Sequence, residues 1–334
     1  MNVKLSILDQ SLIEDGGAEV ALRDTVKLAQ KAEQLGYYRF WVSEHHNSDS
    51  VAGSAPEVLV SYLLARTNTI RIGSGGVMLQ HYSPYKVAET FNVLAALAPE
   101  RVDLGVGKGP GGLPNSTKAL QQGGSALSFE EKLQGLHRFI RNDLREDNEL
   151  TELRAVPAVK RPADLFLLGA SGSSAKLAAV SNLSYVFAHF FNSGNSSLKE
   201  AVTEYRTHWK EDFQPTFILA LSVVVAQTDE IAQSLVKSME VVKINFASGK
   251  SLTFTSREHA EQFAQQANEE CTISVKEANI LYGSKETIRK KLLDIQETYN
   301  PDEIMIVTPV ANFEKRLESF VLLKEAFSDI TVQN

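Results

Sequence analysis

The chain has 334 residues, of which 43% are hydrophobic and 22% are charged, an ordinary composition for a globular protein. Its formal net charge of −7 argues against non-specific binding to nucleic acid or to an anionic membrane. The single cysteine, Cys271, excludes an intrachain disulfide and a metal site built from several cysteines. The first residues lack a signal-peptide pattern and no apolar run reaches membrane-spanning length, so we expect a cytoplasmic protein.

Short apolar runs alternate with helical patterns along the whole chain. Apolar runs predict eight strands, at 3–8, 39–43, 69–74, 101–105, 164–168, 185–188, 217–226 and 303–307. Apolar residues at helical spacing predict the helices between and after them, at 19–35, 55–66, 84–98, 128–143, 173–180, 198–209, 229–242 and 313–326. Eight strand–helix units favour an α/β fold that is one closed (β/α)8 TIM barrel over an open doubly wound sheet.

Two stretches do not fit the repeating unit. Residues 108–125 are rich in glycine and polar side chains and follow the fourth predicted strand. Residues 246–282 form a charged and polar insertion before the last strand. We see no domain linker, so we expect one domain over 1–334, with both stretches as candidate lids over a site.

The second predicted strand runs directly into Glu44, His45 and His46. In this fold the active site lies at the carboxyl ends of the strands, which places the three side chains at the barrel mouth. A neutral imidazole accepts or donates a proton near neutral pH, which suits general acid–base catalysis. The alternative is a polar rim whose hydrogen bonds are satisfied. No metal site is expected, because histidines are few and no HExxH motif is present.

Other strand ends carry glycine, serine and aromatic residues. After the third strand, Ser74, Gly75 and Gly76 allow either close approach of a flat ligand or a simple bulge. The glycine-rich segment with Lys108 suits a phosphate or is a flexible loop, and the aromatic run 188–191 forms either a cofactor wall or core. The segment after the fifth strand opens a helix and suits an anion or is an ordinary helix cap; it contains Ser171, Gly172, Ser173 and Ser174.

Taken in order, several motifs resemble those of the bacterial-luciferase-like flavin monooxygenases. The resemblance covers nearly the whole chain and rests on the segments 36–46, 72–79, 101–107, 168–174, 283–287 and 302–308. It implies a barrel that binds reduced FMN delivered by a separate NAD(P)H:flavin reductase and uses dioxygen to oxidise a small organic substrate. It also implies a homodimer formed through the second and third helices.

The resemblance further assigns roles to individual residues. It makes His45 the base, with Glu44 or His46 orienting it, and it places a cis peptide at Gly75–Gly76 beneath the flavin ring. It assigns the flavin phosphate to Lys108, Ser171 and Ser174.

Two positions depart from the family pattern. Lys108 stands where an arginine is usual, which removes bidentate contact with a phosphate. Gly107 stands where the luciferase catalytic subunit carries a reactive cysteine, so light emission is not implied. Two alternatives remain open: a non-catalytic flavin-binding relative, and a dehydrogenase that uses the deazaflavin F420.

Overall fold

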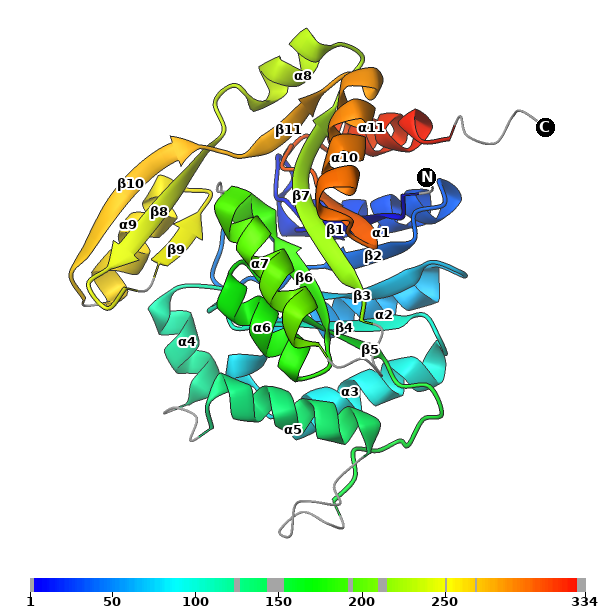
Figure 1. The fold of residues 1–334 in the computed structure, drawn as a ribbon, viewed down its shortest axis with the longest axis vertical. Helices are drawn as coiled ribbons and strands as arrows, with labels where there is room; N and C mark the ends of the chain where they lie inside the picture. The colour runs from blue at the N-terminus through cyan, green and yellow to red at the C-terminus, as the bar shows by residue number, and fades with distance from the viewer. Residues whose placement is uncertain are drawn as a thin grey trace.

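Eight parallel strands close into a barrel in the computed structural model, which describes residues 3–122, 127–142, 153–191, 195–209, 215–249, 251–267 and 269–328 (Figure 1). Each of β1 to β6 pairs with its successor, β6 pairs with β7, and β12 lies between β7 and β1. The predicted single-domain TIM barrel is therefore confirmed. The barrel strands are β1 (Leu5–Asp9), β2 (Arg39–Val42), β3 (Arg71–Met78), β4 (Val102–Gly107), β5 (Asp164–Gly169), β6 (Ser184–Ala188), β7 (Phe217–Val225) and β12 (Glu303–Val307).

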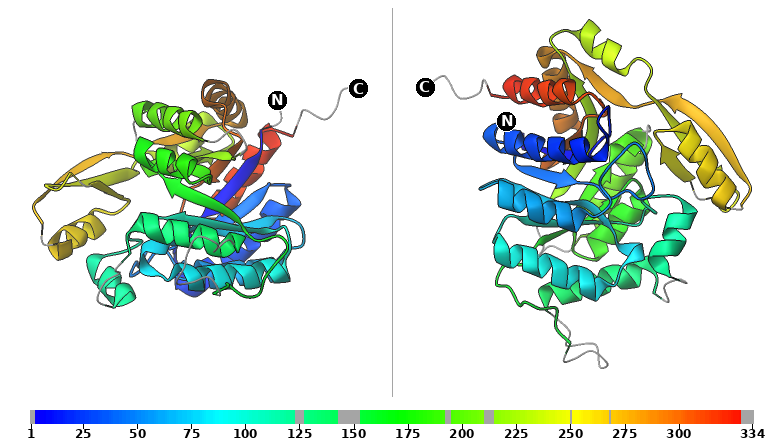
Figure 2. Two further views of the ribbon diagram at one scale, coloured as in Figure 1. Left: turned by 60° about the horizontal axis from the view of Figure 1, so that its bottom comes forward. Right: turned by 180° about the vertical axis from the view of Figure 1, so that it is seen from behind.

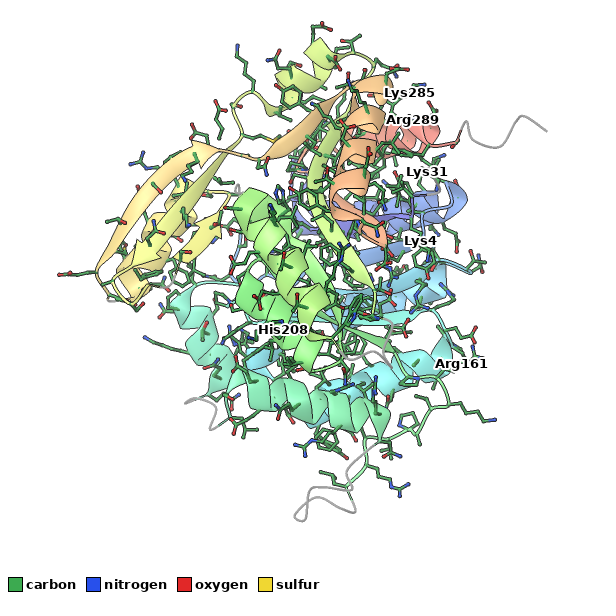
Figure 3. The ribbon with its side chains drawn as sticks, in the orientation of Figure 1. Lys4, Lys31, Arg161, His208, Lys285 and Arg289 are labelled. Carbon is green, nitrogen blue, oxygen red and sulfur yellow. The ribbon has the colours of Figure 1, made fainter. Side chains whose placement is uncertain are left out.

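A ring of helices covers the outside of the barrel (Figure 2). The ring contains α1 (Gly17–Gln34), α2 (Pro56–Arg66), α3 (Pro84–Leu97), α5 (Phe129–Arg141), α6 (Gly172–Val180), α7 (Asn195–His208), α10 (Lys285–Tyr299) and α11 (Phe313–Ala326). Proline in the first turn starts α2 and α3, while Ser128 and Ser171 form capping boxes for α5 and α6. In Figure 3, Lys285 and Arg289 project from α10, where they bond Glu325 and the Ala326 carbonyl.

A second, smaller sheet interrupts the repeating pattern between β7 and β12. After the short helix α8 (Asp229–Val236), the chain forms β8 (Glu240–Phe246), β9 (Ser251–Phe254), α9 (Arg257–Ala267), β10 (Cys271–Glu277) and β11 (Ile280–Gly283). Strands β10, β8 and β9 pair antiparallel beside the barrel (Figure 1), and β11 returns to pair with the end of β7. We call residues 240–277 the excursion; the insertion predicted at 246–282 begins within β8.

The predicted helix over 229–242 is wrong, because the helix ends at Val236 and a strand begins at Glu240. The reason is visible in the burial pattern, since Val242, Ile244 and Phe246 alternate with more exposed residues and form one apolar face. The predicted helix 128–143 ends earlier, at Arg141, and Asp143 lies outside the described residues. Residues 114–121 form α4 (Pro114–Gln121), within the stretch expected to be irregular.

The barrel interior is filled by the indole of Trp41. Its ring packs edge-to-face on Phe166 at 5.0 Å, and its Nε1 donates to Asp103 Oδ2 at 2.9 Å. A methyl group at Gly73, Gly75 or Gly105 would lie 2.7, 3.1 and 3.3 Å, respectively, from atoms of this ring. The glycines of β3 and β4 therefore make room for Trp41, which forms the floor of the barrel mouth.

Candidate active site

The segment after β2 places His45 at the mouth with Ser43 beside it. Ser43 Oγ lies 3.2 Å from His45 Nδ1, and the His45 N–H donates to the Gly53 carbonyl at 2.7 Å. The ring keeps some solvent contact, but the protein packed around it lowers the pKa of His45 to about 4, and His46 and His259 act in the same direction. His45 is therefore neutral near pH 7, and burial makes it a weaker base than a free imidazole.

Glu44 is the centre of a buried hydrogen-bond network that does not include the His45 ring. Its carboxylate accepts from His46 Nε2 at 2.7 Å, from the Tyr82 hydroxyl at 2.7 Å and from the Met78 N–H at 2.9 Å. Burial and the Glu44 charge raise the pKa of Tyr82, so its hydroxyl stays protonated. Glu44 thus joins the end of β2 to the end of β3. It bonds His46 directly and acts on the His45 ring through its charge, which opposes the lowering of the His45 pKa.

The turn after β3 is held by a buried lysine from α5. Lys132 Nζ donates to the carbonyls of Gln80 and Tyr82 at 2.7 and 3.1 Å, and burial lowers the pKa of this ammonium group. In the same turn, His81 Nε2 donates to the Pro110 carbonyl at 2.8 Å, and burial lowers its pKa too. The turn that carries Tyr82 is therefore anchored from two sides.

The excursion lies over the mouth and makes contact on both sides of it. On the β2 side, His259 Nε2 of α9 donates to the Asn47 carbonyl at 3.2 Å. On the β6 side, the Thr253 hydroxyl donates to the Phe191 carbonyl at 3.3 Å. Leu113, at the start of α4, packs in one apolar cluster with the excursion, whose members include Ile244, Phe246 and Phe263. The excursion is therefore seated on three separate segments around the mouth.

The third strand end carries an irregularity of the kind that the bulge interpretation of its glycines predicts. The peptide bond between Gly75 and Gly76 is cis, as the resemblance implies, and the pairing of β3 with β4 shifts register between Gly75 and Val77. Ser74 is fully buried and donates to the Gly105 carbonyl at 2.9 Å, so its side chain does not reach the mouth. A methyl group at Gly76 would lie 2.7 Å from the Gly105 carbonyl oxygen. Packing against β4 is thus sufficient to require glycine there.

The end of β4 lacks side chains at Gly107 and Gly109, and the Met78 side chain lies beside both. A methyl group at Gly107 would find no atom closer than Met78 Sδ at 3.8 Å, and one at Gly109 would find the same sulfur at 3.6 Å. Glycine at both positions leaves only the Met78 side chain in contact distance. Lys108 is two-thirds exposed, with Nζ 3.1 Å from Glu130 Oε1.

The serines after β5 form the first turn of α6. Ser171 Oγ accepts from the Ser174 N–H at 3.2 Å and lies 2.9 Å from Ser173 Oγ, while Ser174 Oγ lies 2.8 Å from the Tyr185 hydroxyl. Gly172 is buried in this turn. Hydroxyl groups and a helix N-terminus together suit an anion such as a phosphate. Because β4 pairs with β5, this turn and the Lys108 segment follow neighbouring strands.

Sequence reasoning missed four side chains around the motif: Ser43, Tyr82, His81 and His259. Ser43 alone had a usable signal, since it stands in the same short segment two residues before His45. The other three reach the motif through tertiary packing, which no local pattern reports. In the part of the chain that the structure describes, no group of three His, Cys, Asp or Glu side chains is arranged to hold a metal ion. No helix among those residues is long and apolar enough to cross a bilayer.

The fold and the site together describe a TIM barrel with a partly exposed histidine, His45, after the end of β2. The family model described as luciferase-like monooxygenase matches residues 1–300, so the chain belongs to the luciferase-like monooxygenase family. The N-acetyl-S-alkylcysteine monooxygenase of Bacillus subtilis (strain 168) is 46% identical over 327 residues, covering 97% of this chain and 98% of the relative.

Solved structures agree with the family assignment. The crystal structure of apo-MsnO8 superposes with a TM-score of 0.77 at 30% identity and covers 98% of both chains. A type II Baeyer–Villiger monooxygenase, the oxygenating constituent of 3,6-diketocamphane monooxygenase of Pseudomonas putida in complex with FMN, has a TM-score of 0.70 at 17% identity and covers 97% of both chains. The latter likeness concerns the fold alone.

Proposed function

We propose that this protein is a flavin-dependent monooxygenase that uses reduced FMN and dioxygen to oxidise a small organic substrate. The observation that carries the proposal is His45, with Ser43 at its Nδ1, at the same end of the barrel as the serine-rich first turn of α6. Reduced flavin, when bound, supplies two electrons; one oxygen atom of O2 enters the substrate and the other leaves as water. Membership of a monooxygenase family supports this chemistry.

The chain's own residues would supply binding, proton transfer and exclusion of water. The bare end of β4 would accept the flavin ring, and Lys108 with the first turn of α6 would hold the phosphate. His45 would hold or move a proton, with Ser43 at its Nδ1 fixing the ring. The excursion would shield the mouth from water as a lid.

The substrate class follows from the relative with 46% identity. We propose that the substrate is an S-alkyl thioether of an N-acetylated cysteine, because identity at this level extends over both chains in full. A reductase that delivers reduced FMN is part of the proposal, because each turnover consumes two electrons that the flavin must receive from another donor.

An anaerobic titration with oxidised FMN, reduced FMN and F420, followed by admission of air, tests the proposal. We expect preference for reduced FMN and flavin-dependent oxygen uptake that rises when an S-alkyl-N-acetylcysteine is present. Tight binding of oxidised FMN without oxygen uptake would favour the non-catalytic flavin-binding protein. Binding of F420 alone would favour the dehydrogenase.

His45→Asn separates catalysis from flavin binding. We expect turnover to fall about 10²- to 10⁴-fold, the usual effect of losing a general acid–base group, while the dissociation constant for reduced FMN stays within twofold. Turnover equal to that of the unmodified enzyme would show that His45 belongs to a polar rim.

We further propose a homodimer through α2 and α3, which lie side by side in Figure 2. A groove of about 750 Å³ separates them, and its lining includes the exposed side chains of Val58, Tyr62, Val93 and Val156. An exposed apolar surface of this kind is unfavourable in water unless another surface covers it.

A further inference from the structure

Each of the two elements proposed to bind the flavin phosphate already faces a carboxylate. The first is Lys108, whose ammonium group lies 3.1 Å from Glu130 Oε1 in the first turn of α5. The pKa of Glu130 is lowered by its own backbone N–H at the helix start and then by Lys108, so this carboxylate is charged at neutral pH.

The second carboxylate belongs to Glu200 of α7, which packs along α6. A methyl group at Gly172 would lie 2.5 Å from Glu200 Oε1 and 2.8 Å from its Cδ, so the carboxylate lies directly against the first helical residue of α6. A negative group is favourable at this end of a helix, where the backbone N–H groups point outward. Glu200 therefore lies at the N-terminus of α6, where a phosphate would gain the same favourable interaction with the helix end.

From these contacts we infer that Glu130 and Glu200 weaken the binding of a phosphate-bearing flavin and so keep the cofactor exchangeable. A phosphate that approaches Lys108 must replace Glu130 as its partner, and at the α6 turn it meets the like charge of Glu200. This inference rests on the proposed function and adds two affinity-determining residues to it. An enzyme that receives reduced flavin from a reductase and releases oxidised flavin needs such exchange.

Paired titrations with reduced FMN and reduced riboflavin under anaerobic conditions test the inference, because only FMN carries the phosphate. We expect Glu130→Gln and Glu200→Gln each to tighten FMN binding about two- to fivefold, the range of exposed ion pairs, and to leave riboflavin binding unchanged. The gain should shrink at high salt, where exposed charges are screened.

Neighbouring carboxylates provide matched controls. Glu131 lies in the same turn as Glu130 but accepts from the Ser128 N–H at 2.7 Å, and glutamine preserves that cap. Glu204 lies one turn after Glu200 and pairs with His208 at 3.4 Å. We expect Glu131→Gln and Glu204→Gln to change the FMN-to-riboflavin affinity ratio by less than the two test variants.

Two further results would overturn the inference in distinguishable ways. If the unmodified protein binds FMN but Glu130→Gln and Glu200→Gln leave the affinity ratio unchanged or lower, the inference fails and the proposed function stands. If the unmodified protein binds neither flavin, the proposed function fails and the inference fails with it.

Discussion

Glu44 illustrates how one buried carboxylate organises the site at the residue scale. It has no solvent exposure and accepts hydrogen bonds from His46 in its own segment, from the last residue of β3 and from Tyr82 after that strand. A buried carboxylate is stable only while such donors are present. The stability of the buried Glu44 carboxylate thus depends on each donor, so removing a single donor side chain measures its contribution.

Tyr82→Phe removes one of these donors and leaves the ring in place. We expect the free energy of unfolding to fall by about 1–3 kcal/mol, since a buried charged acceptor loses a hydrogen bond. Urea unfolding followed by circular dichroism measures the change. Tyr85→Phe is the matched control, because the Tyr85 hydroxyl donates to the Arg154 carbonyl at 3.3 Å and interacts with Glu89, outside the Glu44 network. Equal effects of the two variants would contradict this account of Glu44.

Acid should destabilise the protein through His45 and His137. Burial lowers the pKa of each from 6.5 to about 4, so between these values the unfolded chain binds protons that the folded protein does not. Their contribution to stability is complete above pH 6.5 and is lost as the pH falls towards 4. We expect the double variant His45→Asn, His137→Asn to show a shallower fall in Tm over this range. An unchanged slope would refute the assignment.

At the scale of elements, the excursion depends on one apolar cluster for its position. Phe263 is 5% exposed and contacts Phe246 and Phe254 at ring distances of 6.1 and 5.3 Å. We expect Phe263→Ala to lower the free energy of unfolding of the excursion by about 3–5 kcal/mol, as is typical for truncation of a buried aromatic residue. Hydrogen exchange should therefore accelerate across 240–277 and remain unchanged in the barrel strands.

Ile273→Ala on β10 is the control, because this side chain is 40% exposed. Acceleration of exchange in the barrel after Phe263→Ala would show that the excursion does not open as a separate unit. A rise in KM for the organic substrate, with retained FMN binding, would agree with its proposed role as a lid.

Elements of the barrel were predictable and those of the excursion were not, for a physical reason. Barrel strands are buried on both sides, so runs such as 217–225 are apolar throughout and stand out from the sequence. Strand β10 is mostly exposed and carries few apolar residues in its pattern. In β8, Val242, Ile244 and Phe246 alternate with period two. Neither glycine nor proline separates this strand from helix α8 in the sequence, so the helical pattern and the strand pattern were assigned together to one predicted helix.

The residues of the candidate site also divide into those that the sequence predicted and those that it did not. His45 and the glycines were found because they follow strands directly, and the fold places strand ends together. His259 stands 214 positions after His45 (259 − 45) and reaches the motif only because the excursion folds back onto Asn47. Glu130 and Glu200 likewise approach from helices whose own sequence patterns describe only their packing.

At the scale of the whole molecule, the groove between α2 and α3 predicts self-association. Val93 is 45% exposed there, and Val93→Glu would place a charge in the proposed dimer contact. We expect the unmodified protein to be a dimer by size-exclusion chromatography with light scattering and this variant to be a monomer. Val180→Glu on α6 is the control, since Val180 is 49% exposed outside the groove. If the unmodified protein is a monomer, the proposed homodimer is wrong.

The indole that fills the barrel has a consequence for the order of events. Trp41 is fully buried in the apolar cluster that packs the barrel interior, so we expect ligands to enter and leave at the carboxyl ends of the strands, beside the excursion. The ligand bound deepest must bind first and leave last. We therefore expect ordered binding, in which flavin binds before the organic substrate, and a second turnover that begins only after product and flavin have left.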